Sequence, residues 1–127
     1  MQRINMCIQR ILTPLFFLII SFTCIAQNMG AVESLQQQLK EATADSNIII
    51  LNCKLAFEIV EADRDKAKAY VAAAEKLISK TGYQKGKMMA VYAKGMIADY
   101  EAKTDSSIAY FEQAIRSEEH TSELQSL

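Results

Sequence analysis

Apolar positions recur along most of the chain at the three- and four-residue spacing of an amphipathic helix. No stretch keeps the strict alternation of apolar and polar residues that is typical of a half-buried strand. The pattern predicts helices over residues 32–42, 47–62, 64–80 and 84–102, and a fifth helix that follows a cap at Thr104 or Asp105. The expected fold class is therefore all-α.

Each predicted helix carries a stripe of apolar or small residues that we expect to face the core. The stripes are Val32, Leu35 and Leu39; Ile48, Leu51, Leu55 and Ile59; Ala67, Tyr70, Val71, Ala74, Leu77 and Ile78; Met88, Val91, Tyr92, Gly95, Met96 and Asp99; and Ser107, Ile108, Phe111, Ala114 and Ile115.

Short polar segments between the stripes supply signals for helix ends. Asp45 or Ser46 is the predicted N-cap of the second helix, and Asp63 that of the third. Thr104 or Asp105 is expected to cap the fifth helix, and Gly82 to end the third, because glycine tolerates the left-handed conformation. Such short connections favour antiparallel neighbours, so helices two and three should form one hairpin and helices four and five another.

The two predicted hairpins share a pattern of small and large residues. Small residues let two helix backbones approach closely, and a large residue fills the space beside them. The repeat-packing positions are Ala56, Ala67, Val71 and Ala74 in the first hairpin, and Gly95, Ser107, Phe111 and Ala114 in the second.

This arrangement resembles the tetratricopeptide repeat (TPR), whose pattern has an aromatic, Leu-Gly and Tyr in the first helix and Ala-x-x-x-Phe in the second. Gly95, Ser107 and Phe111 match it, as do Ala56 and Ala67. The chain departs at the aromatic, tyrosine and closing proline positions, and Lys94 stands where the leucine before Gly95 belongs. The repeats lie 39 residues apart (95 minus 56) rather than about 34. The resemblance covers residues 47–115 and implies about two antiparallel hairpins stacked as part of an α-solenoid.

In such repeats the first helix of each pair lines a concave groove for a peptide. The resemblance therefore implies a peptide groove made of apolar, methionine and polar side chains that share a helix face. Its candidate residues are Cys53, Phe57 and Val60 in one repeat, and Met89, Tyr92, Met96 and Asp99 in the other. The alternative is that these residues pack on a neighbouring helix of a longer array. Cys53 is interpreted as a small buried or groove-lining residue rather than a reactive thiol.

Residues 1–26 have the pattern of a secretory signal peptide. Arg3 and Arg10 precede an apolar run over residues 15–22, and Cys24-Ile25-Ala26 places small residues at a cleavage site after Ala26. The alternatives are an uncleaved anchor and a lipoprotein acylated at Cys24. The 12 residues from Leu15 to Ala26 are fewer than the ~20 that span a bilayer. The pattern predicts an exported protein, periplasmic or extracytoplasmic, with a linker and short helix over residues 27–46.

The C-terminal segment, residues 116–127, has a different character. Arg116–Ser126 reads RSEEHTSELQS, which resembles the in-frame translation of a common sequencing adapter at all 11 positions. We therefore expect this segment to be non-native, the native chain to diverge near Ile115 and to continue in a longer protein, and His120 to carry no function. The alternative is a natural polar tail.

Charge and composition narrow the function classes. With 14 Lys and Arg against 15 Asp and Glu, the chain lacks the basic excess of a nucleic-acid binder. His120 is the single histidine, so acid–base and metal chemistry have few candidates. The acidic residues around Asp63 are interpreted as caps and solvated surface. We expect no catalytic, cofactor or metal site and no enzyme activity.

These expectations combine into an exported TPR-like protein–protein interaction module, a fragment of a longer protein. Its partner is expected to be a protein or peptide, not a nucleic acid, and a membrane would be met only through an uncleaved signal or a downstream span. The alternative is the periplasmic input domain of a membrane-bound histidine kinase or transcription regulator. An apolar run of about 20 residues downstream, followed by output-domain motifs, would favour that alternative.

Overall fold

The computed structural model describes residues 30–126, and within that range the chain is helical between short connections and contains no strand. Residues 30–41 form an N-terminal helix. It is followed by α2 (Asp45–Ile59), α3 (Arg64–Thr81), α4 (Gln84–Tyr100) and α5 (Thr104–Ser126). The all-α prediction is confirmed. The predicted signal peptide, residues 1–26, lies outside the described residues.

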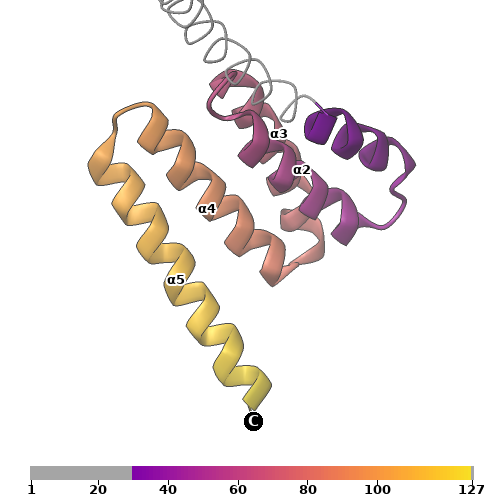
Figure 1. The fold of residues 1–127 in the computed structure, drawn as a ribbon. Coiled ribbons are helices and arrows are strands. Elements are labelled where there is room, and N and C mark those ends of the chain that lie inside the picture. Colours follow the sequence, from indigo (N-terminus) through magenta and orange to yellow (C-terminus); the bar gives the residue numbers. More distant parts are fainter. Residues whose placement is uncertain (1–29, 127) are drawn as a thin grey trace, which may run out of the picture.

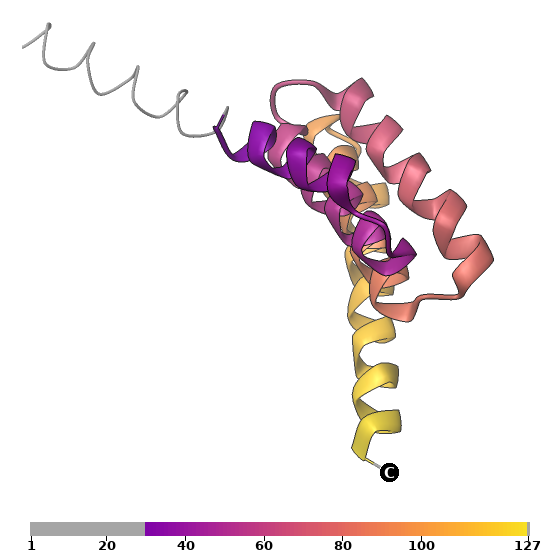
Figure 2. The same cartoon turned by 90° about the vertical axis from the view of Figure 1, so that its right-hand side faces the viewer.

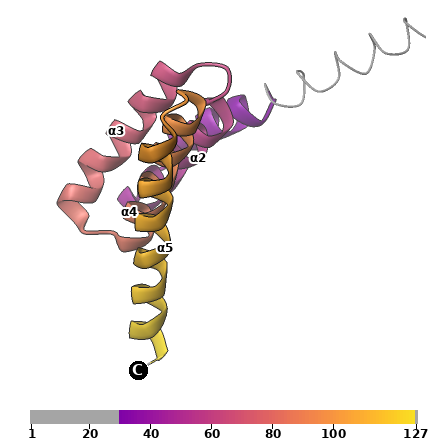
Figure 3. The ribbon, with the colours of Figure 1, turned by 90° about the vertical axis from the view of Figure 1, so that its left-hand side faces the viewer.

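The helices alternate in direction along the chain, so that α2 and α4 run one way and α3 and α5 the other (Figure 1). Helix α2 packs on α3, α4 packs on α5, and α4 also contacts both α2 and α3. Figures 2 and 3 view the molecule from opposite sides and place α3 on one side of α2 and helix 30–41 on the other. Helix α4 is thus the element that joins the two hairpins.

The core lies where α4 meets the first hairpin. Its buried residues come from α2 and the turn after it, from α3 and from α4. They are Ile49, Cys53, Ala56, Ile59 and Val60; Ala67, Val71 and Ala74; and Ala90, Ala93 and Ile97. The α3 stripe predicted from the sequence is confirmed, because Ala67, Val71 and Ala74 are buried and the other predicted positions are partly buried.

The buried face of α2 is wider than the predicted stripe. Ile49 is completely buried, whereas Ile48, the predicted start of the stripe, is only partly buried. Leu51, Leu55 and Ile59 are buried as expected. The predicted stripe was too narrow because α2 is in contact with both α3 and α4, so more than one side of the helix is covered.

Helix α4 differs most from the prediction. Its buried residues include Ala90, Ala93 and Ile97, none of which belongs to the predicted stripe. Tyr92 and Asp99, which do belong to it, are exposed. The helix is covered on two sides, by the first hairpin and by α5, so no single stripe describes its burial.

In α5 the predicted stripe is correct in part. Ser107 and Ala114 are buried and Phe111 is partly buried. Ile108 and Ile115, however, are 51% and 57% exposed. Among the described helices α5 packs on α4 alone, so only a narrow strip of its surface is covered.

The helix ends follow the sequence signals at two of four places. The Asp63 carboxylate accepts a hydrogen bond from the Lys66 N–H at 2.9 Å, and Gly82 ends α3 with a φ of 66°. At the start of α2 the prediction was wrong, because the N-cap is Ala44, whose side chain cannot accept a hydrogen bond. Helix α5 begins at Thr104, so Thr104 and Asp105 lie in its first turn rather than before it.

The close approach predicted between the helices of the second hairpin is present. A Cβ placed on Gly95 would lie 2.6 Å from the Phe111 ring, so α4 and α5 can touch here only because residue 95 is glycine. In the first hairpin Ala56, Ala67, Val71 and Ala74 are all buried. Helix α5 continues through the adapter-like segment Arg116–Ser126, whose origin stays a prediction.

Candidate functional site: an apolar groove on α4 and α5

A groove of about 410 Å³ opens beside α4 and α5. We call it the α4/α5 groove. Its lining residues come from α2, α4 and α5 and are Phe57, Met88, Met89, Tyr92, Phe111, Ala114, Ile115 and Glu118. All of them except Glu118 precede Arg116, so the groove depends little on the adapter-like segment.

An aromatic row of three rings crosses the groove from α2 to α5. The Tyr92 ring lies between the other two, with its centroid 5.7 Å from that of Phe57 and 5.2 Å from that of Phe111. The Phe57 and Tyr92 rings meet edge to face, at 84°, which is a favourable geometry for aromatic pairs. Gly95 makes the row possible, because its missing side chain leaves room for Phe111 against α4.

The chemistry of the groove is that of a binding surface. Its walls are hydrocarbon, thioether and aromatic groups, and its polar side-chain groups are the Tyr92 hydroxyl and the Glu118 carboxylate. Tyr92 is 47% exposed and Ile115 is 57% exposed. A contiguous exposed apolar surface of this kind is typical of an interaction site.

The structure divides the groove residues predicted from the sequence. Phe57, Met89 and Tyr92 line the α4/α5 groove. Met96 is partly buried against the core, and Asp99 is exposed but does not line this groove.

Two predicted groove residues belong to the core instead. Cys53 is completely buried and Val60 is 2% exposed, so neither has a surface to offer a peptide. The physical reason is that α3 and α4 pack on α2 and cover this side of it.

Sequence reasoning missed the contribution of the second helix of the hairpin. Phe111 and Ala114 were assigned to packing alone, and Met88 and Ile115 to inward-facing stripes. Phe111 both packs on Gly95 and lines the groove.

The Cys53 thiol is a core group. Burial, and secondarily the carboxylate of Glu75, raises its pKa from 9.0 to about 12. The thiol therefore stays protonated at neutral pH, and thiolates rather than thiols are the nucleophiles and metal ligands. No group of three or more potential metal ligands gathers among residues 30–119, whose side chains the structure describes.

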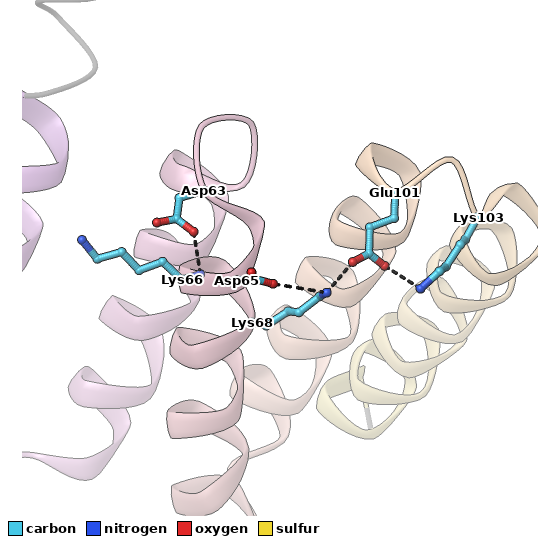
Figure 4. Close-up of polar contacts among 6 residues, drawn as sticks. All are labelled: Asp63, Asp65, Lys66, Lys68, Glu101 and Lys103. Carbon is cyan, nitrogen blue, oxygen red and sulfur yellow. Dashed lines mark hydrogen bonds and ion pairs between the residues drawn. The ribbon is translucent and has the colours of Figure 1, made fainter.

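A second, polar surface lies where α3 meets the turn between α4 and α5 (Figure 4). Glu101 forms ion pairs with Lys68 of α3 and, at 2.8 Å, with Lys103. Hydrogen bonds from these two ammonium groups lower the pKa of Glu101 from 4.5 to about 2. Lys68 also lies 3.7 Å from Asp65. These charges satisfy one another and tie the first hairpin to the second.

The acidic residues near Asp63 behave as the sequence indicated. Asp63 caps α3, and the Asp65 carboxylate lies beside Lys68 in the network just described. Nearby, Glu75 of α3 pairs with Lys94 of α4, whose ammonium nitrogen is 6.0 Å from the centre of the Tyr110 ring. These groups act as a cap and as links between helices.

None of the helices within residues 30–126 combines the length and the apolar character needed to cross a membrane. No match to this chain was found among protein-family models, among curated proteins or among solved structures.

Proposed function

We propose that the chain is a TPR-like helical module that binds a protein partner through the α4/α5 groove. The observation that carries the proposal is the groove itself, a volume of about 410 Å³ lined almost wholly by apolar side chains. Tyr92 and Ile115 are about half exposed within it. Exposed aromatic and aliphatic side chains around a concavity are the anchors that protein partners commonly use.

The packing of the hairpins supports a repeat array. Helix α4 contacts both helices of the first hairpin, as the first helix of a stacked repeat would. The contact between Gly95 and Phe111 combines a small and a large residue at the positions where the TPR pattern has them. In this proposal α2 and α3 form one repeat and α4 and α5 the next.

The module is proposed to act outside the cytoplasm, on the strength of the signal-peptide pattern in residues 1–26. A binding role rather than a catalytic one is supported by the charged groups of the described helices. Asp63 serves as a cap, and Glu101, Lys68 and Lys103 serve as ion pairs. The same surface would serve a secreted scaffold or an extracytoplasmic input domain.

Panning the immobilised chain against a random 16-residue peptide library tests the proposal. Enriched peptides should lose at least about tenfold in affinity for the Ile115→Glu variant, because a carboxylate in an apolar groove costs more than about 1.4 kcal/mol on binding. Ile108→Glu is the matched control, since Ile108 is similarly exposed on the same helix and does not line the groove. Enriched peptides that bind both variants with the same affinity as they bind the parent would contradict the proposal.

A further inference from the structure

The internal repeat relates each groove residue of α4 and α5 to a residue of the first hairpin. The first helices are offset by 39 positions, as Ala56 and Gly95 show, and the second helices by 40, as Val71 and Phe111 show. Applied to the groove, these offsets give the following pairs: Met88 with Ile49, Met89 with Ile50, Tyr92 with Cys53, Phe111 with Val71, Ala114 with Ala74, Ile115 with Glu75, and Glu118 with Ile78.

The surface made by those first-hairpin residues is covered by a helix, and that helix is α4. Gly86 of α4 lies so close to α2 that a Cβ there would overlap the Ile49 side chain, and it would be in ordinary van der Waals contact with Ile78 of α3 at 3.5 Å. Glu75 forms an ion pair with Lys94 of α4.

Ile50 is partly buried, and the other remaining first-hairpin counterparts are core residues. Cys53, Val71 and Ala74 are between 0% and 3% exposed and share the core with the α4 residues Ala90, Ala93 and Ile97. Their counterparts in the second hairpin include Tyr92, which is 47% exposed. The groove surface of the second hairpin is therefore equivalent to the surface of the first hairpin that α4 covers. No helix among the described residues covers the groove surface.

From this equivalence we infer that the α4/α5 groove binds an amphipathic helix of a partner protein, seated on α4 and α5 as α4 is seated on α2 and α3. The inference rests on the proposed function and specifies the class of partner. By the same equivalence the bound helix runs parallel to α4, because α2 and α4 run in the same direction (Figure 1).

The way α4 packs on the first hairpin predicts the spacing and size of the residues on the partner helix. In α4 the residues that face the first hairpin are Gly86, Ala90, Ala93 and Ile97, spaced by four, three and four. The partner needs the same spacing, with small residues at its first three positions. Tyr92 is the counterpart of the smaller Cys53, so it leaves less room between the groove and a bound helix. The partner therefore needs small residues at these positions even more than α4 does.

The pair Ile115 and Glu75 predicts a second feature of the partner helix, because the two counterparts differ in charge. Glu75 pairs with Lys94 of α4, whereas Ile115 offers an apolar partner only. The partner residue at the position of Lys94 should therefore be apolar, since a lysine there would lose its counter-ion and part of its hydration.

A helix suits this groove better than an extended peptide does. The groove offers two polar side chains, Tyr92 and Glu118, among its eight lining residues. An extended backbone would leave most of its N–H and C=O groups unpaired against apolar walls. A helix satisfies these groups internally and presents only side chains.

A second copy of this chain is a poorer occupant. The Gly86-to-Ile97 stripe of any copy is already covered by its own α2 and α3, so it is not free to dock elsewhere. We assign the groove to a helix of a different protein, and we treat a second copy of this chain and a helix of a longer native chain beyond Ile115 as outcomes to be measured.

Two displayed peptide libraries test the inference with the chain itself as target. The first has an 18-residue Ala/Glu/Lys helical frame, randomised at five positions that reproduce the placing of Gly86, Ala90, Ala93, Lys94 and Ile97. The second is identical except for two interior prolines, which prevent a continuous helix. The expected result is enrichment from the first library only, with Gly, Ala or Ser at the first three stripe positions and an apolar residue at the position of Lys94.

The enriched helices should bind at least tenfold more weakly to Tyr92→Glu and Ile115→Glu variants and equally well to Ile108→Glu. Enrichment from the proline library alone would overturn the inference and leave the proposed function standing. Enrichment from neither library would overturn both. Light scattering that finds a dimer of the chain, returned to a monomer by Ile115→Glu, would overturn the assignment to a different protein. So would a longer native chain that no longer binds the enriched helices, because its own next helix would then occupy the groove.

Discussion

Gly95 is the residue on which the geometry of the second hairpin depends most directly. A Cβ at this position would lie 2.6, 2.7 and 3.2 Å from three atoms of the Phe111 ring. Replacing glycine by alanine in a helix gains about 1 kcal/mol of helix propensity, but forcing the ring aside costs about 1–3 kcal/mol. We expect Gly95→Ala to lower the free energy of unfolding in urea by about 1 kcal/mol.

The control for this prediction is a double-mutant cycle. In a Phe111→Leu background the overlap is relieved, so the same Gly95→Ala substitution should raise the stability by up to about 1 kcal/mol. Equal effects in both backgrounds would mean that the Phe111 ring does not limit the approach of the two helices.

Cys53 offers a chemical probe of the core. Because the side chain is completely buried and its pKa is raised to about 12, the native thiol should resist alkylating reagents at pH 8. We expect Cys53 to react at least about 100-fold more slowly in buffer than in guanidinium chloride. In a chain with Cys7→Ser and Cys24→Ser, Cys53 is the one thiol that can be alkylated. Similar alkylation rates in buffer and in guanidinium chloride would place Cys53 at an accessible surface.

At the scale of the elements, α2 and α4 both start without a hydrogen bond from an N-cap side chain, and the start of α2 is the one that a single substitution tests most simply. Ala44 is its N-cap and makes no side-chain hydrogen bond to the first turn. An aspartate at the N-cap accepts such a bond, so Ala44→Asp should raise the free energy of unfolding by about 1 kcal/mol. Thr43→Asp adds the same charge one residue earlier. An equal gain from both variants would indicate a charge effect rather than capping.

The ion pairs of Glu101 predict a pH dependence. The folded pKa of Glu101, about 2, lies below its ordinary value of 4.5, so the unfolded chain binds the proton more readily. The stabilisation from this carboxylate is therefore present above about pH 4.5 and is lost as the pH falls toward 2. Glu101→Gln should be less stable than the parent at pH 7 and equal to it near pH 2.

Two comparisons keep this measurement specific. Glu58→Gln removes an exposed carboxylate of α2 and serves as the charge-matched control. In 1 M salt the difference between Glu101→Gln and the parent should shrink, because exposed ion pairs are screened. A difference that persists at pH 2 would show that Glu101 stabilises the fold by packing rather than by charge.

Of the predicted stripes, that of α3 agrees best with the structure. The stripe of α3, from Ala67 to Ile78, is correct because its opposite face is solvated and polar. The stripe of α4 could not be found in this way, since alanines and glycine fill two buried faces at once. Nor does spacing alone distinguish Ala44 from Asp45 as the cap of α2, because helix ends are uncertain by one or two residues.

At the scale of the whole molecule, the packing of the helices on one another decides which faces stay open, and so where the groove lies. The sequence assigned Phe57, Met89 and Tyr92 to a binding surface, and these residues line the α4/α5 groove. It also assigned Cys53 and Val60, which are buried because α3 and α4 pack on α2. Periodicity places residues on a face of a helix, but tertiary packing decides whether that face is covered.

The pattern of contacts also predicts how stability is distributed. Helix α4 contacts α2, α3 and α5, whereas the C-terminal turns of α5 extend past the end of α4 in Figure 1. Hydrogen exchange measured by mass spectrometry should therefore be slowest for the amides of α4 between Ala90 and Ile97. The amides of residues 120–126 should exchange at least about 100-fold faster, because they can open without unfolding the core.

This exchange measurement bears on the interaction surface as well. A partner helix seated in the α4/α5 groove would touch Ala114 and Ile115, so adding a groove-binding peptide should slow exchange in that part of α5. The α3 amides should be unaffected, because α3 contributes no residue to the groove. If the last turns of α5 are as protected as α4 in the isolated chain, they are already covered, and a second copy of the chain becomes the natural candidate for what covers them.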